Sequence, residues 1–379
     1  MSLRSLPSVD SVLVRSDENI KRYGRELTTK AIRAALNDFR QLLQNNNYEN
    51  VEINQIYGRV DEILITWTTL SLQAVINATG VIIHTNLGRS PLSQSAIYSM
   101  NTASANYSNL EYDLISGKRG SRWSHSENIL KELLNVEAAL VVNNCASAVL
   151  LVLSALANRK QVIISRSQLI EIGGGFRIPD VMKQSGAKIV EIGTTNKVHL
   201  ADYEAALSQT QQTERAVVMT AHKSNFKIIG FTEEPELFDI IELTHKNQSV
   251  FIDDLGSGAL INTEEFGLAH EPTVQDAILA GADIVMFSGD KLVGGPQSGI
   301  IVGKKILLDK IRKHPLARVV RADKLSIAGL NATLLHYLKN EYKVEIPIWR
   351  MVSMSIDDLS KRVKKWKDEL GIGEIDALL

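Results

Sequence analysis

The spacing of apolar and polar positions changes character near residue 73. Before that point, apolar residues recur every three or four positions in the segments 8–14, 24–44 and 54–70. This spacing places the apolar side chains on one face of a helix. The pattern therefore predicts a small helical N-terminal domain over residues 1–72.

From residue 73 onward, short runs rich in β-branched residues alternate with helical stretches such as 145–157 and 233–247. The runs read AALVVN, QVIISR, AKIVEI, RAVVMT, SVFIDD and ADIVMF. This alternation is typical of a mostly parallel α/β sheet flanked by helices. We predict such a domain over residues 73–325, with ligands at the carboxyl ends of its strands. Residues 326–379 return to amphipathic helical patterns and are predicted to form a C-terminal helical segment.

Composition narrows the class of protein. The chain has 379 residues and a formal net charge of −1, so it has no overall polyanion-binding signature. Cys145 is the only cysteine, which excludes an intrachain disulfide and favours a reducing, cytoplasmic compartment. We expect no membrane span, because no uninterrupted apolar run reaches about 18 residues. The histidines form no H-E-x-x-H pattern, so we expect no metal site.

Lys291 is the first candidate for chemistry. It lies in SGDKLVGGPQSG (288–299), between the apolar runs 282–287 and 300–303. A lysine beside a buried strand end can be desolvated and form a Schiff base. For an isolated Lys-Gly-Gly sequence, a lysine in a surface turn is the commoner interpretation.

Two further patterns favour the Schiff base. Asp253 and Asp254 end the preceding strand, in VFIDDLGSG, at an interval that suits one strand–helix–strand unit before Lys291. A carboxylate there can pair with the ring nitrogen of pyridoxal phosphate (PLP), although one aspartate could instead cap the turn.

The second pattern is a possible phosphate cup. Asn144, Cys145 and Ala146 join a strand to an apolar helix whose first N–H groups can bind a phosphate. Many α/β proteins have a similar turn there. For Cys145 itself, a small packing residue is favoured over a nucleophile. Phosphate cup, carboxylate and lysine occur in the order expected of a fold-type I PLP enzyme.

Several long motifs then carry a resemblance to a known family. They are INATGVIIHTNLGRSPLS (76–93), RGSRWSH (119–125), SNFKIIGFTEEP (224–235), DDLGSGAL (253–260), SGDKLVGGPQSGIIVGKK (288–305) and HPLARVVRADK (314–324). On these motifs the chain resembles the bacterial selenocysteine synthases, the L-seryl-tRNA(Sec) selenium transferases, over residues 3–340.

The resemblance implies a fold-type I large domain, a tRNA-binding N-terminal domain and the conversion of L-seryl-tRNA(Sec) into L-selenocysteinyl-tRNA(Sec). PLP would form an internal aldimine with Lys291, and selenophosphate would supply selenium to a dehydroalanyl-tRNA intermediate. Asp254 would face the ring nitrogen, with Asp253 as the fallback. Asn225 would touch the phenolic oxygen, with a polar surface turn as the alternative. Asp290 would help the serine hydroxyl to leave or would steer the intermediate.

The resemblance also assigns the selenophosphate to arginines, which suit phosphate recognition. They are Arg89, Arg318 and Arg321, and the last two would share a face if both lay on one helix. A solvated basic face is the alternative for that pair, because residues 304–324 carry eight Lys/Arg against two Asp/Glu. His125 lies in a family motif without an assignable role.

Three further expectations follow from the resemblance. The family forms a ring of dimers with active sites between subunits, so we expect a homo-oligomer. Ser167 stands where the family has glycine, which would strain a turn that needs a positive φ angle. Family members continue past this terminus, so we expect a reduced C-terminal domain. An inactive tRNA-binding relative, or another PLP-dependent lyase or transferase acting on a small amino acid, remains an alternative function.

Overall fold

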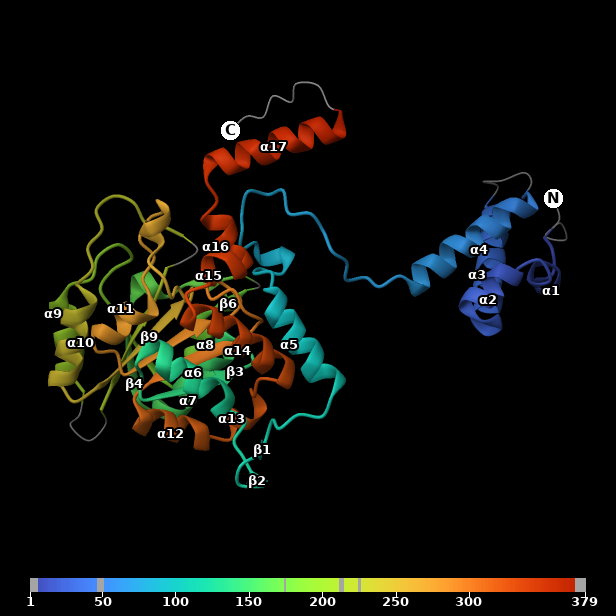
Figure 1. Cartoon of the computed structure of the whole chain (residues 1–379). Helices are drawn as coiled ribbons and strands as arrows, with labels where there is room; N and C mark the ends of the chain where they lie inside the picture. The colour runs from blue at the N-terminus through green and yellow to red at the C-terminus, as the bar shows by residue number, and fades with distance from the viewer. Residues whose placement is uncertain (1–5, 46–50, 174, 211–214, 224–225, 372–379) are drawn as a thin grey trace. The chain divides into compact units, whose positions relative to one another are not determined.

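The computed structural model describes residues 6–45, 51–173, 175–210, 215–223 and 226–371. The chain divides into two compact units, residues 1–76 and 77–379, which we name the helical unit and the α/β unit. Figure 1 labels most of their helices and some of their strands. Within the parts that are described, no helix is long and apolar enough to cross a membrane.

The helical unit is built around one long helix. Its elements are α1 (Val9–Leu13), α2 (Asp17–Tyr23), α3 (Arg25–Gln44) and α4 (Ile53–Thr68). The buried residues of α3 recur at helical spacing, from Ala31 and Ile32 to Ala35 and Leu36, and they pack with buried residues of α4 into one core. A capping box at Glu52 begins α4. The predicted helical segments are confirmed.

A sheet organises the α/β unit. Among the described residues, seven strands pair in the order β3-β11-β10-β9-β8-β4-β7. All neighbours are parallel except β11, which runs antiparallel to both β3 and β10. The strands are β3 (Ala138–Val142), β4 (Gln161–Ser165), β7 (Lys188–Ile192), β8 (Val217–Ala221), β9 (Val250–Gly256), β10 (Ile284–Ser288) and β11 (Gly299–Gly303). The mostly parallel sheet agrees with the predicted fold class.

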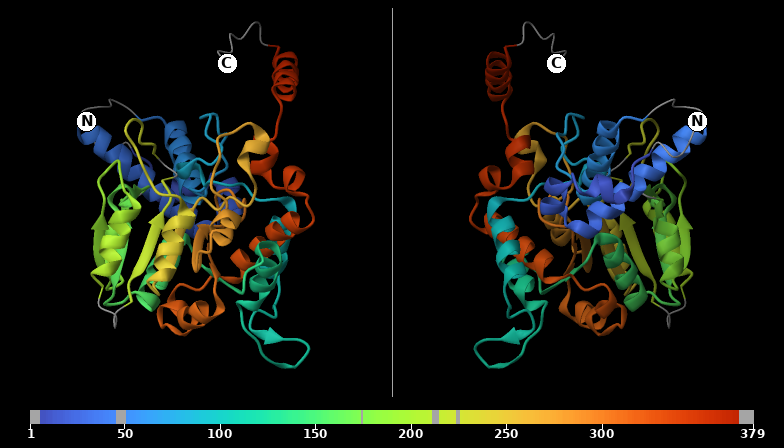
Figure 2. Two further views of the ribbon diagram at one scale, coloured as in Figure 1. Left: turned by 90° about the vertical axis from the view of Figure 1, so that its left-hand side faces the viewer. Right: turned by 90° about the vertical axis from the view of Figure 1, so that its right-hand side faces the viewer.

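Helices cover both faces of this sheet (Figure 2). Successive strand residues alternate between two cores, so that Val285 and Phe287 belong to one core and Ile284 and Met286 to the other. The first core receives α6 (Ser124–Leu134), α9 (Leu200–Ser208), α10 (Leu237–Lys246), α11 (Val274–Leu279) and α14 (Lys324–Leu338). The second receives α7 (Cys145–Leu156), α8 (Ile178–Gln184), α12 (Lys305–Lys313) and α13 (Leu316–Val319).

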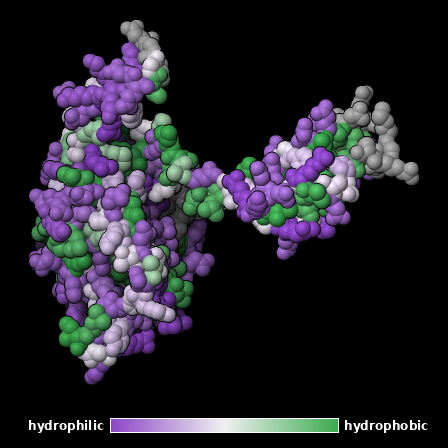
Figure 3. All heavy atoms as spheres, turned by 45° about the vertical axis from the view of Figure 1, so that its right-hand side comes forward, coloured by the Kyte–Doolittle hydropathy of each residue, from purple (hydrophilic) through white to green (hydrophobic). Residues whose placement is uncertain are grey.

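Further helices and strands complete the unit. They are α5 (Gln94–Ala105), a hairpin of β1 (Tyr112–Asp113) and β2 (Lys118–Arg119), a second hairpin of β5 (Glu171–Ile172) and β6 (Phe176–Arg177), α15 (Tyr342–Glu345), α16 (Pro347–Val352) and α17 (Ile356–Leu370). Of these, α16 contributes Ile348 and Trp349 to the first core. Gly329 of α14 permits close packing on α5, because a side chain there would meet Met100. The surface of α17 is mostly hydrophilic (Figure 3).

Two sequence-based expectations about local geometry are wrong. Ser167 lies in a 3₁₀ turn and is not among the residues with a positive φ, so replacing the family glycine strains nothing there. Its hydroxyl instead donates a hydrogen bond to Glu234 Oε1 at 2.8 Å. Arg318 and Arg321 do not share a helix, because α13 ends at Val319 and Arg321 forms an isolated antiparallel bridge with Val142.

Candidate active site

Lys291 lies in a turn fixed by its own backbone between β10 and β11. Gly289 N–H donates to Ser298 O at 2.8 Å, and Gly294 N–H donates to Lys291 O at 3.0 Å. Gly294 has a φ of +74°, and a side chain there would collide with Ile346. Glycine is therefore required at this position, and the turn that carries Lys291 is rigid.

The segment before α5 closes over the same turn. Ser90 Oγ donates to Lys291 O at 2.6 Å, and Arg89 Nη1 lies 2.8 Å from Asp290 Oδ2. Arg89 has a φ of +61°, which is uncommon for a residue with a side chain. Asp290 is 8% exposed, so this ion pair lies mostly out of water. Arg89, Asp290 and Lys291 therefore form one preorganised group.

A cavity of about 250 Å³ opens beside this group, and we name it the lysine cavity. Its lining comes from the carboxyl ends of β8, β9 and β10 and from the start of α7. The functional candidates that line it are Arg89, Asn144, Cys145, Ala146, Asp254, Asp290 and Lys291. Residues separated by more than 200 positions in the sequence thus meet at one edge of the sheet, as a ligand site of a parallel sheet requires.

The two aspartates of β9 point to different surroundings. Asp254 Oδ1 accepts a hydrogen bond from Cys145 Sγ at 3.6 Å and lines the lysine cavity. Asp253 Oδ1 accepts from Thr220 Oγ1 at 2.8 Å and lines a separate cavity. Adjacent residues of a strand face opposite sides, which explains the division. Lys291 and Asp254 both lie near Gly256. A Cβ atom at Gly256 would be 3.9 Å from Lys291 Nζ and 4.0 Å from Asp254 Oδ1.

Both carboxylates are costly to ionise in this chain. Burial raises the pKa of Asp253 to about 6. Burial and the charge of Asp253 together raise the pKa of Asp254 to about 7, although Lys291 acts in the opposite direction. Burial also raises the pKa of the Cys145 thiol, which is therefore neutral near pH 7. The lysine cavity thus presents Asp254, a carboxylate whose ionised form a cation in the cavity would stabilise.

The start of α7 supplies the third feature of the lysine cavity. Asn144 caps the helix, and its side chain accepts a hydrogen bond from Ser147 N–H at 2.8 Å. The first N–H groups of a helix have no partner within the helix, so those of Cys145 and Ala146 are available to an anion. Gly299 permits the close approach of β11, because a side chain there would overlap the Asn144 carbonyl group.

Sequence reasoning missed His222 and Glu271. His222 directly follows β8 and lines the lysine cavity, and its Nε2 lies 3.0 Å from Glu271 Oε1. Its backbone N–H also donates to Asp254 O at 2.9 Å. His222 follows an apolar strand directly, and this position in the sequence could have marked it as a candidate site residue. Asn225, the candidate for the phenolic oxygen, lies outside the described residues.

Arg318 and Arg321 lie elsewhere, at a cavity of about 500 Å³ that we name the basic cavity. It is lined by Glu111, Arg119, Gly120, Ser121, Arg122, Trp123, Arg312, Lys313, His314, Pro315, Arg318 and Arg321. Within one chain, therefore, the three candidate arginines do not meet at one cavity. Arg89 lines the lysine cavity, and the other two line the basic cavity.

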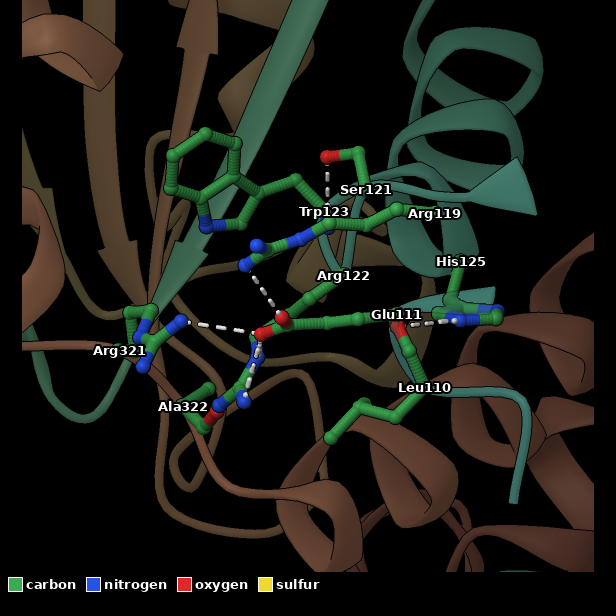
Figure 4. A network of polar contacts seen from close by, with 9 residues as sticks. All are labelled: Leu110, Glu111, Arg119, Ser121, Arg122, Trp123, His125, Arg321 and Ala322. Carbon is green, nitrogen blue, oxygen red and sulfur yellow. Dashed lines mark hydrogen bonds and ion pairs between the residues drawn. The ribbon is translucent and has the colours of Figure 1, made fainter. Parts of the chain in front are cut away.

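His125 has structural partners near the basic cavity. Its Nε2 lies 3.1 Å from Leu110 O, and its carbonyl group accepts from Asn331 Nδ2. These contacts fix the chain beside Glu111 (Figure 4).

Comparisons with known proteins identify the family of the chain. A family described as L-seryl-tRNA selenium transferase matches residues 75–375, and one described as selenocysteine synthase N terminal matches residues 3–40. The L-seryl-tRNA(Sec) selenium transferase of Carboxydothermus hydrogenoformans is 43% identical over 366 residues, 96% of this chain and 78% of that protein. The protein of the same name from Alkaliphilus metalliredigens is 45% identical over 95% of this chain and 78% of its own length.

Solved structures show the same fold at low sequence identity. D-Glucosaminate-6-phosphate ammonia-lyase superposes with a TM-score of 0.55 and 18% identity, over 77% of this chain and 71% of its own. A structure of SPT with a PLP internal aldimine has a TM-score of 0.50 and 16% identity, over 68% of this chain and 61% of its own. By its sequence matches over most of its length, this chain belongs to the L-seryl-tRNA selenium transferase family.

Proposed function

We propose that the chain converts L-seryl-tRNA(Sec) into L-selenocysteinyl-tRNA(Sec), with PLP as cofactor and selenophosphate as selenium donor. One observation carries the proposal: Lys291, the half-buried Asp254 and the N-terminus of α7 line a single cavity. These groups match the aldehyde, the ring nitrogen and the phosphate of PLP. The curated relatives named above carry the same activity in their names.

The lysine cavity fits PLP by its chemistry. Asp254 is half-buried and has a raised pKa, and a protonated ring nitrogen would stabilise its ionised form. Lys291 would hold the aldehyde, and the N–H groups of Cys145 and Ala146 would hold the phosphate. When bound, PLP supplies an electron sink that stabilises negative charge at the Cα of the seryl group.

The side chains around the cavity have proposed roles in proton transfer. Lys291 is the base that takes the Cα proton. Asp290 helps the serine hydroxyl to leave, and its contact with Arg89 at 2.8 Å holds the carboxyl group in position. His222, held by Glu271, forms a further wall of the cavity. The surrounding apolar residues Val149, Ile170 and Ile178 limit the access of water.

Arg89, Arg318 and Arg321 are the proposed selenophosphate ligands. Because they line two cavities of one chain, we propose that a second subunit completes the site, in a ring of dimers with active sites between subunits. Exposed apolar residues on α5 and the β1–β2 hairpin support a homo-oligomer. Tyr98 is 73% exposed, Leu114 73% and Ile115 100%. Such a patch is typical of a protein–protein contact.

The helical unit is the proposed tRNA-binding part. Its match to the selenocysteine synthase N-terminal family supports this role. Residues 1–45 carry eight Lys/Arg against five Asp/Glu, a slight positive bias. Structured RNA is recognised mostly through shape and backbone contacts, so a slight bias is compatible with binding. The proposed site of action is the cytoplasm, where the aminoacylated tRNA is found.

The test is a reconstituted reaction. Purified chain is incubated with seryl-tRNA(Sec), selenophosphate and PLP, and the amino acid released from the tRNA is identified by mass spectrometry. We expect selenocysteine only when PLP is present and Lys291 is intact. PLP binding without conversion would favour a different PLP enzyme, and tRNA binding without PLP binding would favour an inactive relative.

A further inference from the structure

The basic cavity already holds an anion that belongs to the protein. Glu111 Oε1 accepts hydrogen bonds from Arg122 Nη2 and from Arg321 Nη1, both at 3.0 Å. Glu111 Oε2 accepts from Arg119 Nη2 at 3.1 Å. One carboxylate therefore bridges three guanidinium groups (Figure 4). Burial opposes the ionisation of Glu111, but Arg122 and Arg321 outweigh it and hold the pKa of the carboxyl group below its usual value.

The arginines have supports that do not depend on Glu111. Arg122 Nη1 donates to Ala322 O at 2.8 Å. The backbone of Arg321 is fixed by its bridge to Val142, and Asn143 N–H donates to Val320 O at 2.9 Å beside it. These two side chains are only 18% and 26% exposed. They would therefore keep their positions if the carboxylate moved away.

The cavity has more positive charge than Glu111 can neutralise. Arg318 lines it, and the exposed side chain of this residue makes no hydrogen bond or ion pair with another residue in the described part of the chain. Lys313 is a further exposed cation of the lining. A single negative charge among these groups leaves a net positive site of about 500 Å³. A dianion can form more charge-assisted hydrogen bonds there than a carboxylate, because it presents several oxygens to the guanidinium groups.

We propose that Glu111 is a resident counter-ion, which an incoming anion of the phosphate class replaces on Arg321 and Arg122. The inference rests on the proposed role of Arg318 and Arg321 as donor ligands and deepens it. In the free protein Glu111 offsets the repulsion among the arginines, and it withdraws when the donor binds. Glu111 thereby sets the donor affinity, because the anion must compete with a group that is always present.

The experiment measures the binding of inorganic phosphate to the PLP-loaded chain by calorimetry at fixed ionic strength. Glu111→Gln keeps the size of the side chain and removes its charge. We expect Glu111→Gln to bind phosphate at least about tenfold more tightly than the wild type, or about 1.4 kcal/mol. We also expect phosphate to raise its melting temperature more than that of the wild type, because tighter binding to the native state stabilises it more.

Two variants separate the possible results. Glu132→Gln, at an exposed position of α6, changes the net charge equally and should leave phosphate binding unchanged. Arg321→Ala should abolish the binding. Unchanged or weaker binding in Glu111→Gln, with binding lost in Arg321→Ala, would overturn the counter-ion proposal alone. Binding that survives in Arg321→Ala would overturn the donor site itself, and failure of both the wild type and Glu111→Gln to bind would overturn both.

Discussion

The lysine cavity and the basic cavity differ in how their charges are satisfied. In the lysine cavity, half-buried Asp254 lies beside Lys291, and the pKa of Asp254 is raised to about 7. In the basic cavity, Glu111 has three arginine partners, and its pKa is lowered. The pKa values of two carboxyl groups of one chain are thus shifted in opposite directions by their surroundings. A positively charged group of a ligand would therefore stabilise the ionised Asp254 in the lysine cavity. A negatively charged ligand would bind the arginines of the basic cavity.

The largest effect is expected at Lys291. Lys291→Ala removes the amine that holds PLP and takes the Cα proton, so turnover should fall by about a thousandfold or more. The measurement is the initial rate of selenocysteinyl-tRNA formation, together with the visible absorbance of bound PLP. Lys131→Ala, at an exposed position of α6, serves as the control and should retain both signals. Normal turnover in Lys291→Ala would remove this lysine from the mechanism.

The next effect distinguishes the two aspartates. Asp254→Asn leaves the ring nitrogen without its carboxylate, and the rate should fall by about a hundredfold, a loss near 2.7 kcal/mol. Asp253→Asn should reduce the rate by less than about tenfold, because Asp253 faces Thr220 and a different cavity. The pair is compared by turnover at saturating PLP. If Asp253→Asn lost more turnover than Asp254→Asn, Asp253 would be the partner of the ring nitrogen.

A third prediction concerns the pH dependence of stability in the cofactor-free chain. The folded pKa of Asp254, about 7, lies above its ordinary value of 3.8, so the folded state binds the proton more tightly than the unfolded state. The free energy of unfolding should therefore decrease as the pH rises from about 4 to about 7, by on the order of 3 kcal/mol from this group.

Urea denaturation at pH 5 and pH 7.5 measures this slope. Asp254→Asn should flatten it, and Glu132→Gln should not. Bound PLP should also flatten it, because a cation in the cavity lowers the pKa of Asp254. If the wild type and Asp254→Asn, both without cofactor, have the same slope, the pKa of Asp254 is not raised in the folded state.

The fold could be predicted in large part from the sequence, because strands buried on both faces leave continuous apolar runs. The direction of β11 could not, since Gly299–Gly303 has the same apolar character as its parallel neighbours. The choice between Asp253 and Asp254 also needed the structure. Period-two alternation separates their side chains, but only the packing of α7 shows which one meets Cys145.

The basic cavity could be predicted only in part from the sequence. HPLARVVRADK pointed to Arg318 and Arg321, but Glu111 lies 210 positions from Arg321 and belongs to no local pattern with it. Its role depends on the bridge between Arg321 and Val142, which is a tertiary contact. Helical spacing suggested a shared face for Arg318 and Arg321, and the end of α13 at Val319 removes that geometry.

The smallest effect is expected at Arg318. This side chain is exposed and makes no ion pair with the other described residues, so Arg318→Ala should leave the melting temperature unchanged. Phosphate affinity should fall by about tenfold, the value of one charge-assisted contact. Arg321→Ala should lower both quantities, because it also removes a partner of Glu111. Equal melting temperatures in the two variants would argue against the contact between Arg321 and Glu111.

The central claim is that Lys291 and Asp254 hold PLP in the lysine cavity. The most direct measurement reduces the PLP-loaded chain with borohydride and maps the modified lysine by peptide mass spectrometry. We predict a single pyridoxyl group on Lys291 in the wild type, and none on that peptide in Lys291→Ala. Modification of a different lysine, or labelling spread evenly over surface lysines, would contradict the account.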